Sequence, residues 1–338
     1  MERKSDIDIA KAIGIIMVVW AHAGGPFSSY INQFHMPFFF FLSGILFHMP
    51  DDYKEYVLRK IKTLLIPFWK WNFLLLLPFW LLYFWGKWEI RVLRQYAVEI
   101  GITVNKVPML GATWFLPALF WTCVIFAGVK KVLEKINIKN CLKDVFLLLY
   151  GGISCCVGMY CNFPYRISRN LVCSLFFVLG YLYSKYVRRL EKNQIVVDFF
   201  ACSMGVIYWG IASHNKTDLG GNEYKWKFLF VIGAVMASYA VLIFSRRIAS
   251  IRVWERVIKH LRYLGKNTMP IVIWHFVFFR IAIVLQIITM EAPLGAVTSF
   301  PIYYGKSGWW IIYIVCGIYG SLVWNKVLET LKIKCKDI

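Results

Sequence analysis

The sequence predicts an all-α, polytopic integral membrane protein with about ten transmembrane helices and both termini in the cytoplasm. Hydrophobic residues make up 59% of the 338 residues, compared with about 45–50% in soluble domains, and the mean hydropathy is +0.58. Aromatic residues reach 18%, which is typical of aromatic belts at two membrane interfaces. We expect residues 1–338 to form a single transmembrane domain in the cell (plasma or inner) membrane.

Ten apolar segments are candidates for membrane helices, because a bilayer core takes about 20 apolar residues per helix. They lie at 7–24, 34–49, 63–85, 112–129, 143–161, 168–184, 195–212, 226–245, 267–289 and 308–325. The first is charged at its start and has no small-residue cleavage site, so we do not expect it to be a removed signal peptide.

The 39 Lys and Arg residues indicate the orientation of these segments. With the N-terminus inside, 26 lie in cytoplasmic segments and 10 in external segments, while Lys11, Lys70 and Arg280 fall within helices. This distribution follows the positive-inside rule. The net charge of +21 is therefore interpreted as a topology signal, and no nucleic-acid partner is expected.

The first segment carries two ionisable residues, Lys11 and His22, within an apolar stretch. A spacing of eleven residues is about 20° more than three helical turns, so both lie on one face, roughly 16 Å apart along the axis. Asp8 precedes Lys11 by three residues and is placed to pair with it. Lys11 alone could extend to the cytoplasmic interface and His22 to the outer one, but a shared polar face favours a bundle interior or a hydrated cavity.

Five motifs follow one another along the chain: "DIAKAIGIIMVVWAHA", "NQFHMPFFFFLSGILF", "LRKIKTLLIPFWKWN", "ATWFLPALFW" and "LGKNTMPIVIWHFV". In this order they resemble the membrane-bound acyltransferase type-3 family, and within it the fucose 4-O-acetylase-like group. The first motif has Lys11 where many members have Arg, and Lys also replaces most of the arginines of the third motif.

The resemblance implies an integral-membrane O-acyltransferase that moves an acyl group, in our prediction acetyl, from cytoplasmic acyl-CoA to a hydroxyl. The acceptor it implies is a cell-envelope carbohydrate or a related molecule such as a lipid-linked sugar, and a longer acyl group is an alternative. It implies no permanently bound cofactor, with acetyl-CoA as a substrate. No His, Cys or carboxylate pattern has metal-ligand spacing, so no metal is expected.

A hydroxyl needs a general base to attack a thioester, and His is the commonest one. We predict that His22, near the outer end of its helix and on the family's histidine position, is this base. Lys11 and Asp8 lie deeper and are expected to orient the helix and stabilise the donor end of a channel. His35 enters the next helix from the same side, either as a second acid–base group or as a partner for the 24–33 loop.

Other candidates concern substrate binding. Arg59, Lys60 and Lys62 are expected to bind the CoA phosphates, although an ordinary positive-inside loop is an alternative. Trp114 could stack on a sugar or belong to an interfacial belt. His275 is either a functional membrane histidine or a satisfied core residue, and Asn267 lies about two turns before it on a similar face.

Two other function classes are compatible with the composition. The principal alternative is a transporter or flippase of an anionic or glycan substrate, which intramembrane charges and a basic face would suit. The absence of matching broken segments in the two halves of the sequence disfavours it. A non-catalytic membrane sensor would not need the Lys11–His22 pair together with the four later motifs.

Overall fold

The computed structural model describes residues 5–84, 89–102 and 111–334, and nearly all of this part of the chain is helical. A short antiparallel hairpin, β1 (Thr217–Asp218) paired with β2 (Glu223–Tyr224), accounts for the strands among these residues. The expected all-α class is confirmed. The hairpin lies in a loop for which the sequence suggested no strand.

The α-helices differ widely in length, from 3 to 24 residues. In chain order they are α1 (Ser5–His22), α2 (Ser28–Ile31), α3 (His35–Ile45), α4 (Tyr53–Lys60), α5 (Ile66–Phe84), α6 (Ile90–Ile102), α7 (Phe115–Lys135), α8 (Asn140–Tyr160), α9 (Ile167–Leu182), α10 (Arg188–Leu190), α11 (Gln194–His214), α12 (Lys227–Ser250), α13 (Glu255–Lys266), α14 (Thr268–Met290), α15 (Trp309–Val315) and α16 (Ser321–Lys334). The 3₁₀ turns are η2 (Gly111–Trp114), η3 (Pro164–Arg166), η5 (Arg252–Trp254) and η6 (Leu294–Thr298), and the π-helical turns are η1 (Ile61–Leu65), η4 (Tyr183–Val187) and η7 (Cys316–Gly320).

Seven stretches in the described residues are long and apolar enough to cross a membrane. They are Gly111–Lys135, Asn140–Tyr160, Pro164–Leu190, Gln194–His214, Lys227–Ser250, Thr268–Met290 and Trp309–Leu331. Each coincides with one of the ten predicted segments, so the expectation of a multi-pass membrane protein is confirmed. The total of ten and the cytoplasmic position of both termini stay predictions.

The other three predicted segments are also helical, but each differs from a simple span. Helix α1 contains Asp6, Asp8 and Lys11. Helix α3 has 11 residues, which rise about 16 Å, roughly half of a hydrocarbon core of about 30 Å. The segment predicted at 63–85 begins inside η1 and continues as α5 to Phe84, while residue 85 lies outside the described residues.

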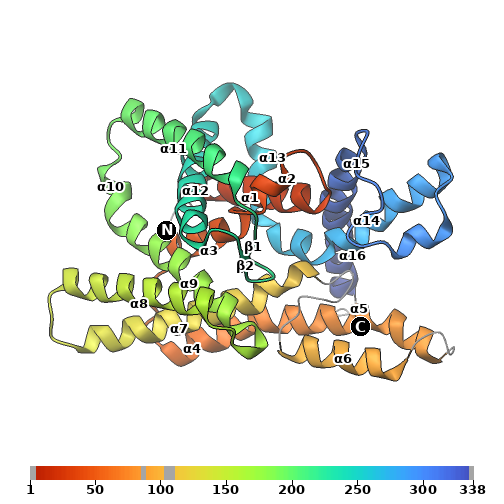
Figure 1. Cartoon of the computed structure of the whole chain (residues 1–338), viewed down its shortest axis with the longest axis horizontal. Coiled ribbons are helices and arrows are strands. Elements are labelled where there is room, and N and C mark those ends of the chain that lie inside the picture. Colours follow the sequence, from red (N-terminus) through yellow and green to blue (C-terminus); the bar gives the residue numbers. More distant parts are fainter. Residues whose placement is uncertain (1–4, 85–88, 103–110, 335–338) are drawn as a thin grey trace.

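Helix α1 lies in the middle of the bundle and contacts α3, α12, α13 and α14, as Figure 1 shows. Most of its apolar side chains are buried, with Ile9, Ala12 and Ile15 fully inaccessible to solvent. Helices α7, α8 and α9 pack side by side, and α14 packs on η7 and α16. Because neighbours surround α1, its polar residues face protein rather than lipid.

Glycines allow the closest helix crossings. A Cβ on Gly44 of α3 would lie 2.0 Å from the Phe177 carbonyl oxygen, and one on Gly180 of α9 would lie 2.0 Å from the Phe41 oxygen. A Cβ on Gly265 of α13 would come within 1.8 Å of the Asp8 carbonyl oxygen in α1. Small residues at such crossings are typical of membrane helix packing. Here they allow α3 to pack closely on α9, and α13 on α1.

An ion-pair network joins the start of α1 to later helices. Asp6 pairs with Arg188 (2.8 Å) and Arg246 (3.4 Å). Arg246 also pairs with Glu191, which accepts a hydrogen bond from the Tyr183 hydroxyl at 2.9 Å. We call Asp6, Tyr183, Arg188, Glu191 and Arg246 the Asp6 network. Its charges compensate one another, which holds the beginning of α1 in place.

Candidate active site

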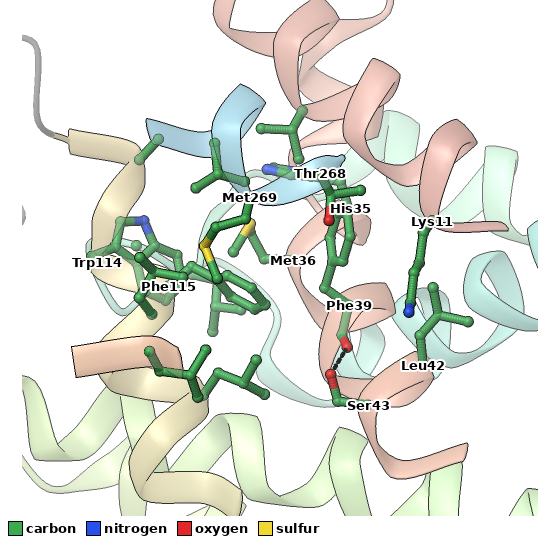
Figure 2. Close-up of a pocket in the computed structure, with 18 of the residues that line it drawn as sticks. Lys11, His35, Met36, Phe39, Leu42, Ser43, Trp114, Phe115, Thr268 and Met269 are labelled. Atoms are coloured by element: carbon green, nitrogen blue, oxygen red, sulfur yellow. Dashed lines mark hydrogen bonds between the residues drawn. The ribbon is translucent and has the colours of Figure 1, made fainter. Parts of the chain in front are cut away.

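A cavity of about 770 Å³ opens beside α1 and is lined by segments that are far apart in the sequence. The lining comes from α1, α3, α4, η1, η2, α7, α9, the hairpin, and α14 with the loop after η6. Figure 2 shows Lys11 from α1, His35, Phe39 and Ser43 from α3, and Trp114 at the start of α7 around this space. Six of the ten candidate site residues line the cavity: Lys11, His22, His35, Arg59, Lys60 and Trp114.

Lys11 and His22 both face the cavity from α1. This follows from their spacing, since eleven residues return nearly to the same side of a helix. His22 is half-buried at the last residue of α1, and its ring lies 4.7 Å from that of Phe276, centroid to centroid. The polar face predicted for the first helix is therefore turned towards an enclosed space.

His275 contacts His22 from α14. The His22 Nδ1 and His275 Nε2 atoms are 3.0 Å apart, and the two rings are nearly parallel, with 4° between their planes. His275 is fully buried, and its Nδ1 lies 2.7 Å from the Ile271 carbonyl oxygen. Residues 253 positions apart thus form one hydrogen-bonded pair at the cavity wall.

The hydrogen bonds assign the protons of this histidine pair. A carbonyl oxygen only accepts, so His275 Nδ1 must carry the proton that it donates to Ile271. In a neutral ring, His275 Nε2 is then the acceptor for a proton on His22 Nδ1. His22 Nε2 is left with a free lone pair, which is the form that a general base requires.

His35 is held differently. It begins α3, is 6% exposed, and donates from Nδ1 to the Ile31 carbonyl oxygen at 2.8 Å. This bond reaches back into the 24–33 loop, as one of its two predicted roles requires. Its ring centroid lies 6.3 Å from that of His22, with the planes nearly perpendicular. His35 therefore has a fixed ring and an Nε2 lone pair beside the same cavity.

Basic residues occupy another part of the lining. Arg59 and Lys60 line the cavity beside Tyr56, Thr63 and His48. The Arg59 guanidinium carbon lies 5.7 Å from the centre of the Tyr56 ring, and Lys60 Nζ lies 5.3 Å from it. Within the described part of the chain, neither cation forms an ion pair with a carboxylate. This arrangement leaves positive charge facing the cavity.

The remaining four candidates do not line the cavity. Asp8 is 3% exposed on α1 and lies against α13. Lys62 is exposed, and Asn267 ends α13, where its side-chain amide donates to the Tyr263 carbonyl oxygen at 2.8 Å. His275 stands behind His22 and reaches the cavity only through it.

The sequence reasoning missed the hairpin and the residue behind it. Thr217 and Asp218 line the cavity, and Arg169 is fully buried behind Trp114, with its guanidinium carbon 4.1 Å from the centre of the indole ring. In the sequence, Arg169 stands out only as one of the ten basic residues of the external segments. The one signal available was an Arg next to an apolar helix, which is too common to indicate a site.

Comparison with known families gives this geometry a context. A family model described as an acyltransferase domain matches residues 4–326. The chain belongs to the acyltransferase type-3 family. This confirms the resemblance that the five motifs suggested, and it favours an acyltransferase over a transporter, while the fucose 4-O-acetylase-like group stays a prediction. A search of curated proteins finds no match.

In this multi-pass membrane acyltransferase, His22 and Lys11 line one cavity. Among the described residues, no group of three or more His, Cys, Asp or Glu side chains could hold a metal ion.

Proposed function

We propose that this chain, acting as a single domain in the cell membrane, transfers an acyl group, in particular acetyl, from cytoplasmic acyl-CoA to a hydroxyl of an envelope carbohydrate. His22 is the general base. The observation that carries the proposal is the His22–His275 hydrogen bond (3.0 Å), because it leaves a basic nitrogen on a ring that lines a cavity.

The reaction needs two proton transfers, one to His22 from the acceptor hydroxyl and one from His22 to the leaving thiolate. The acceptor hydroxyl gives its proton to His22 Nε2 while its oxygen attacks the thioester carbonyl carbon. The tetrahedral intermediate then collapses, the carbon–sulfur bond breaks, and the His22 imidazolium returns the proton to the leaving CoA thiolate. An ester and free CoA result, and the histidine is again neutral.

His275 and Lys11 support this step without taking part in bond formation. His275 Nε2 accepts the hydrogen bond from His22 Nδ1 and so fixes the tautomer and the plane of the base. Lys11 lines the cavity about three helical turns below His22, where it provides a positive charge for the donor. Asp8 orients this part of α1, and His35 is the second acid–base group.

The donor end is the part of the cavity lined by Arg59 and Lys60. CoA carries phosphate groups, and cationic side chains without carboxylate partners suit them. On the predicted topology this end opens to the cytoplasm, where acyl-CoA is present. Trp114 and the hairpin line the other end, which the same topology assigns to the outside.

The test is transfer of labelled acetyl from acetyl-CoA to envelope carbohydrate extracted from cells that lack the gene. His22→Gln keeps a polar side chain but removes the titrating ring, and we expect turnover to fall about 10²–10⁴-fold, the usual contribution of a positioned base. His214→Gln is the matched control, because His214 is exposed and lies outside the cavity lining. A folded His22→Gln protein that works at the wild-type rate would overturn the proposal and make His35 the next candidate.

A further inference from the structure

One wall of the cavity is made by loop segments. Thr217, Asp218, Leu219 and Gly220 of the hairpin line it, together with Trp114 at the start of α7. The hairpin is anchored to its surroundings, since Leu219 is buried and Asn222 donates its side-chain amide to the Gly158 carbonyl oxygen at 3.0 Å. The predicted topology places all these segments outside, on the acceptor side.

Buried polar atoms without partners surround this wall. Arg169 is 0% exposed and donates from Nη1 to the Gly220 carbonyl oxygen at 3.1 Å, but its Nε and Nη2 have no hydrogen-bond partner. The Thr217 hydroxyl oxygen is buried and also has no partner. Buried polar groups in proteins are normally satisfied. Arg169 lies behind Trp114 and does not line the cavity, so among these atoms only the Thr217 hydroxyl belongs to a residue of the wall itself.

Asp218 contributes a carboxylate to the same wall. It lies close enough to His35 and Arg169 to act on both electrostatically, and it forms no ion pair within the described ranges. Gly221 makes room for it, because a Cβ there would lie 2.8 Å from Asp218 Oδ2. Asp218 is exposed and lines the cavity, so its carboxylate is open to donors there.

We propose that Thr217, Asp218 and Trp114 form the acceptor subsite, and that this subsite takes an uncharged sugar ring. Asp218 accepts hydrogen bonds from two ring hydroxyls, Thr217 bonds a third polar group, and the indole of Trp114 covers the apolar face of the ring. Arg169 stacks behind the indole at 4.1 Å and positions it. The proposal rests on the proposed function, since it assigns the acceptor for that reaction.

The charge of the wall decides between sugar classes. Asp218 is negative and lines the cavity itself, whereas Arg169 lies behind Trp114 and does not line it. An acidic sugar would bring its carboxylate towards Asp218, which is exposed, and like charges in contact repel each other even there. A neutral sugar instead offers hydroxyl donors to the carboxylate, and hydrogen bonds to a charged group are the stronger kind.

The experiment is equilibrium dialysis of the purified full-length protein with labelled methyl glycosides. The probes are the methyl α-glucoside and α-galactoside and the two corresponding uronides, which differ only at C6. We expect the wild type to bind the neutral pair at least about tenfold more tightly. Asp218→Asn should weaken neutral binding about tenfold and bring the ratio of neutral to acidic affinity close to one. Glu223→Gln is the matched control, because Glu223 is the exposed register partner of Asp218 on β2 and lies outside the cavity lining.

Acetyl-CoA binding is measured on the same preparations. Acetyl-CoA binding should be unchanged in Asp218→Asn, which shows that the variant is folded. Thr217→Val serves as a second variant, in which the binding of the neutral glycosides should also be weakened. The proposal is overturned if the uronides bind the wild type as tightly as the neutral glycosides, if no neutral glycoside binds, or if Asp218→Asn keeps the wild-type ratio. If the wild type does not bind acetyl-CoA, this result would instead contradict the proposed function, whichever glycosides bind.

Discussion

Two sets of charged residues, both expected on the cytoplasmic side, differ in what surrounds them. In the Asp6 network, carboxylates and guanidinium groups pair with one another at distances such as 2.8 Å for Asp6 and Arg188. Arg59 and Lys60 instead lie against the Tyr56 ring and face the cavity, with no carboxylate paired to them in the described part of the chain. Paired charge stabilises the fold, whereas charge left open to a cavity is available for an anionic ligand.

This difference separates two kinds of mutant. Changes to residues around the cavity should alter turnover or substrate affinity and leave thermal stability nearly unchanged. Changes in the Asp6 network should lower thermal stability and leave turnover and substrate affinity nearly unchanged. A mutant that mixes the two effects would show that the two sets are coupled.

The largest effect after loss of His22 itself is expected at His275. His275→Leu removes the acceptor for His22 Nδ1, so the base loses its fixed tautomer and orientation, and misplacement of a catalytic group costs about 10²-fold. We expect kcat to fall by about this factor while KM for acetyl-CoA stays the same. His275→Gln keeps an amide oxygen as an acceptor and should recover part of the rate. Equal rates in the Leu variant and the wild type would reduce His275 to a core residue.

The wild-type rate should depend on pH through the same pair. His22 acts as a base only when its ring is neutral, so turnover should be full at high pH and be lost as pH falls through a single ionisation. The pH profile of kcat measures this directly. A profile that stays flat across the range in which imidazoles titrate would show that no histidine limits the reaction.

A smaller effect is expected at the donor end. Replacing both Arg59 and Lys60 by Gln should weaken acetyl-CoA binding about tenfold, and the wild-type advantage should shrink at high salt because exposed charge is screened. Lys62→Gln is the matched control, since Lys62 is exposed on the same segment but does not line the cavity. If the dissociation constant for acetyl-CoA is unchanged in the double variant, these cations do not bind the donor and reflect only the positive-inside rule.

The Asp6 network should affect stability alone. Glu191 accepts hydrogen bonds from Tyr183 and pairs with Arg246, so Glu191→Gln leaves Arg246 with one ionic partner fewer. Losing a hydrogen bond to a charged group costs about 1.5–3 kcal/mol, and we expect a Tm lower by several degrees with unchanged acetyl-CoA affinity. A variant with wild-type Tm and weakened donor binding would reverse the assignment of the two sets.

The sequence was sufficient for the features that depend on local periodicity. Each of the ten predicted segments contains a helix among the described residues, and the spacing of Lys11 and His22 correctly predicted a shared polar face, because both depend only on 3.6 residues per turn. Lys62 shows where this reasoning fails. Lys62 follows Arg59 by three residues, a spacing that gives a shared face in an α-helix. A π-helical turn begins at Ile61, and its wider winding changes the direction of the side chains that follow, so Lys62 does not line the cavity beside Arg59.

Features that depend on tertiary contacts could not be predicted. The His22–His275 bond joins α1 to α14, and no pattern in either segment indicates that their ends meet. Helix α13 carries many charges and lies outside the ten predicted segments, yet Gly265 brings it against α1. Asp218 is an ordinary loop carboxylate in the sequence, and only the fold turns it towards the cavity.

The assignment of inside and outside can be tested separately. We predict that a Cys at position 192 and a Cys at position 223, introduced singly into a cysteine-free variant, react with an impermeant maleimide from opposite sides of the membrane. Both Lys192 and Glu223 are exposed, so lack of access would not explain a negative result. Labelling of both positions from outside intact cells would contradict the predicted topology.

The central claim is that one cavity lets a donor on one side of the membrane meet an acceptor on the other at His22. Sealed membrane vesicles with the cytoplasmic face outward test it most directly, with envelope carbohydrate enclosed in the lumen and labelled acetyl-CoA added outside. We predict that label accumulates on the enclosed carbohydrate, and that vesicles of the opposite orientation give none until they are permeabilised. Label that appears only on carbohydrate placed on the same side as acetyl-CoA would contradict the account.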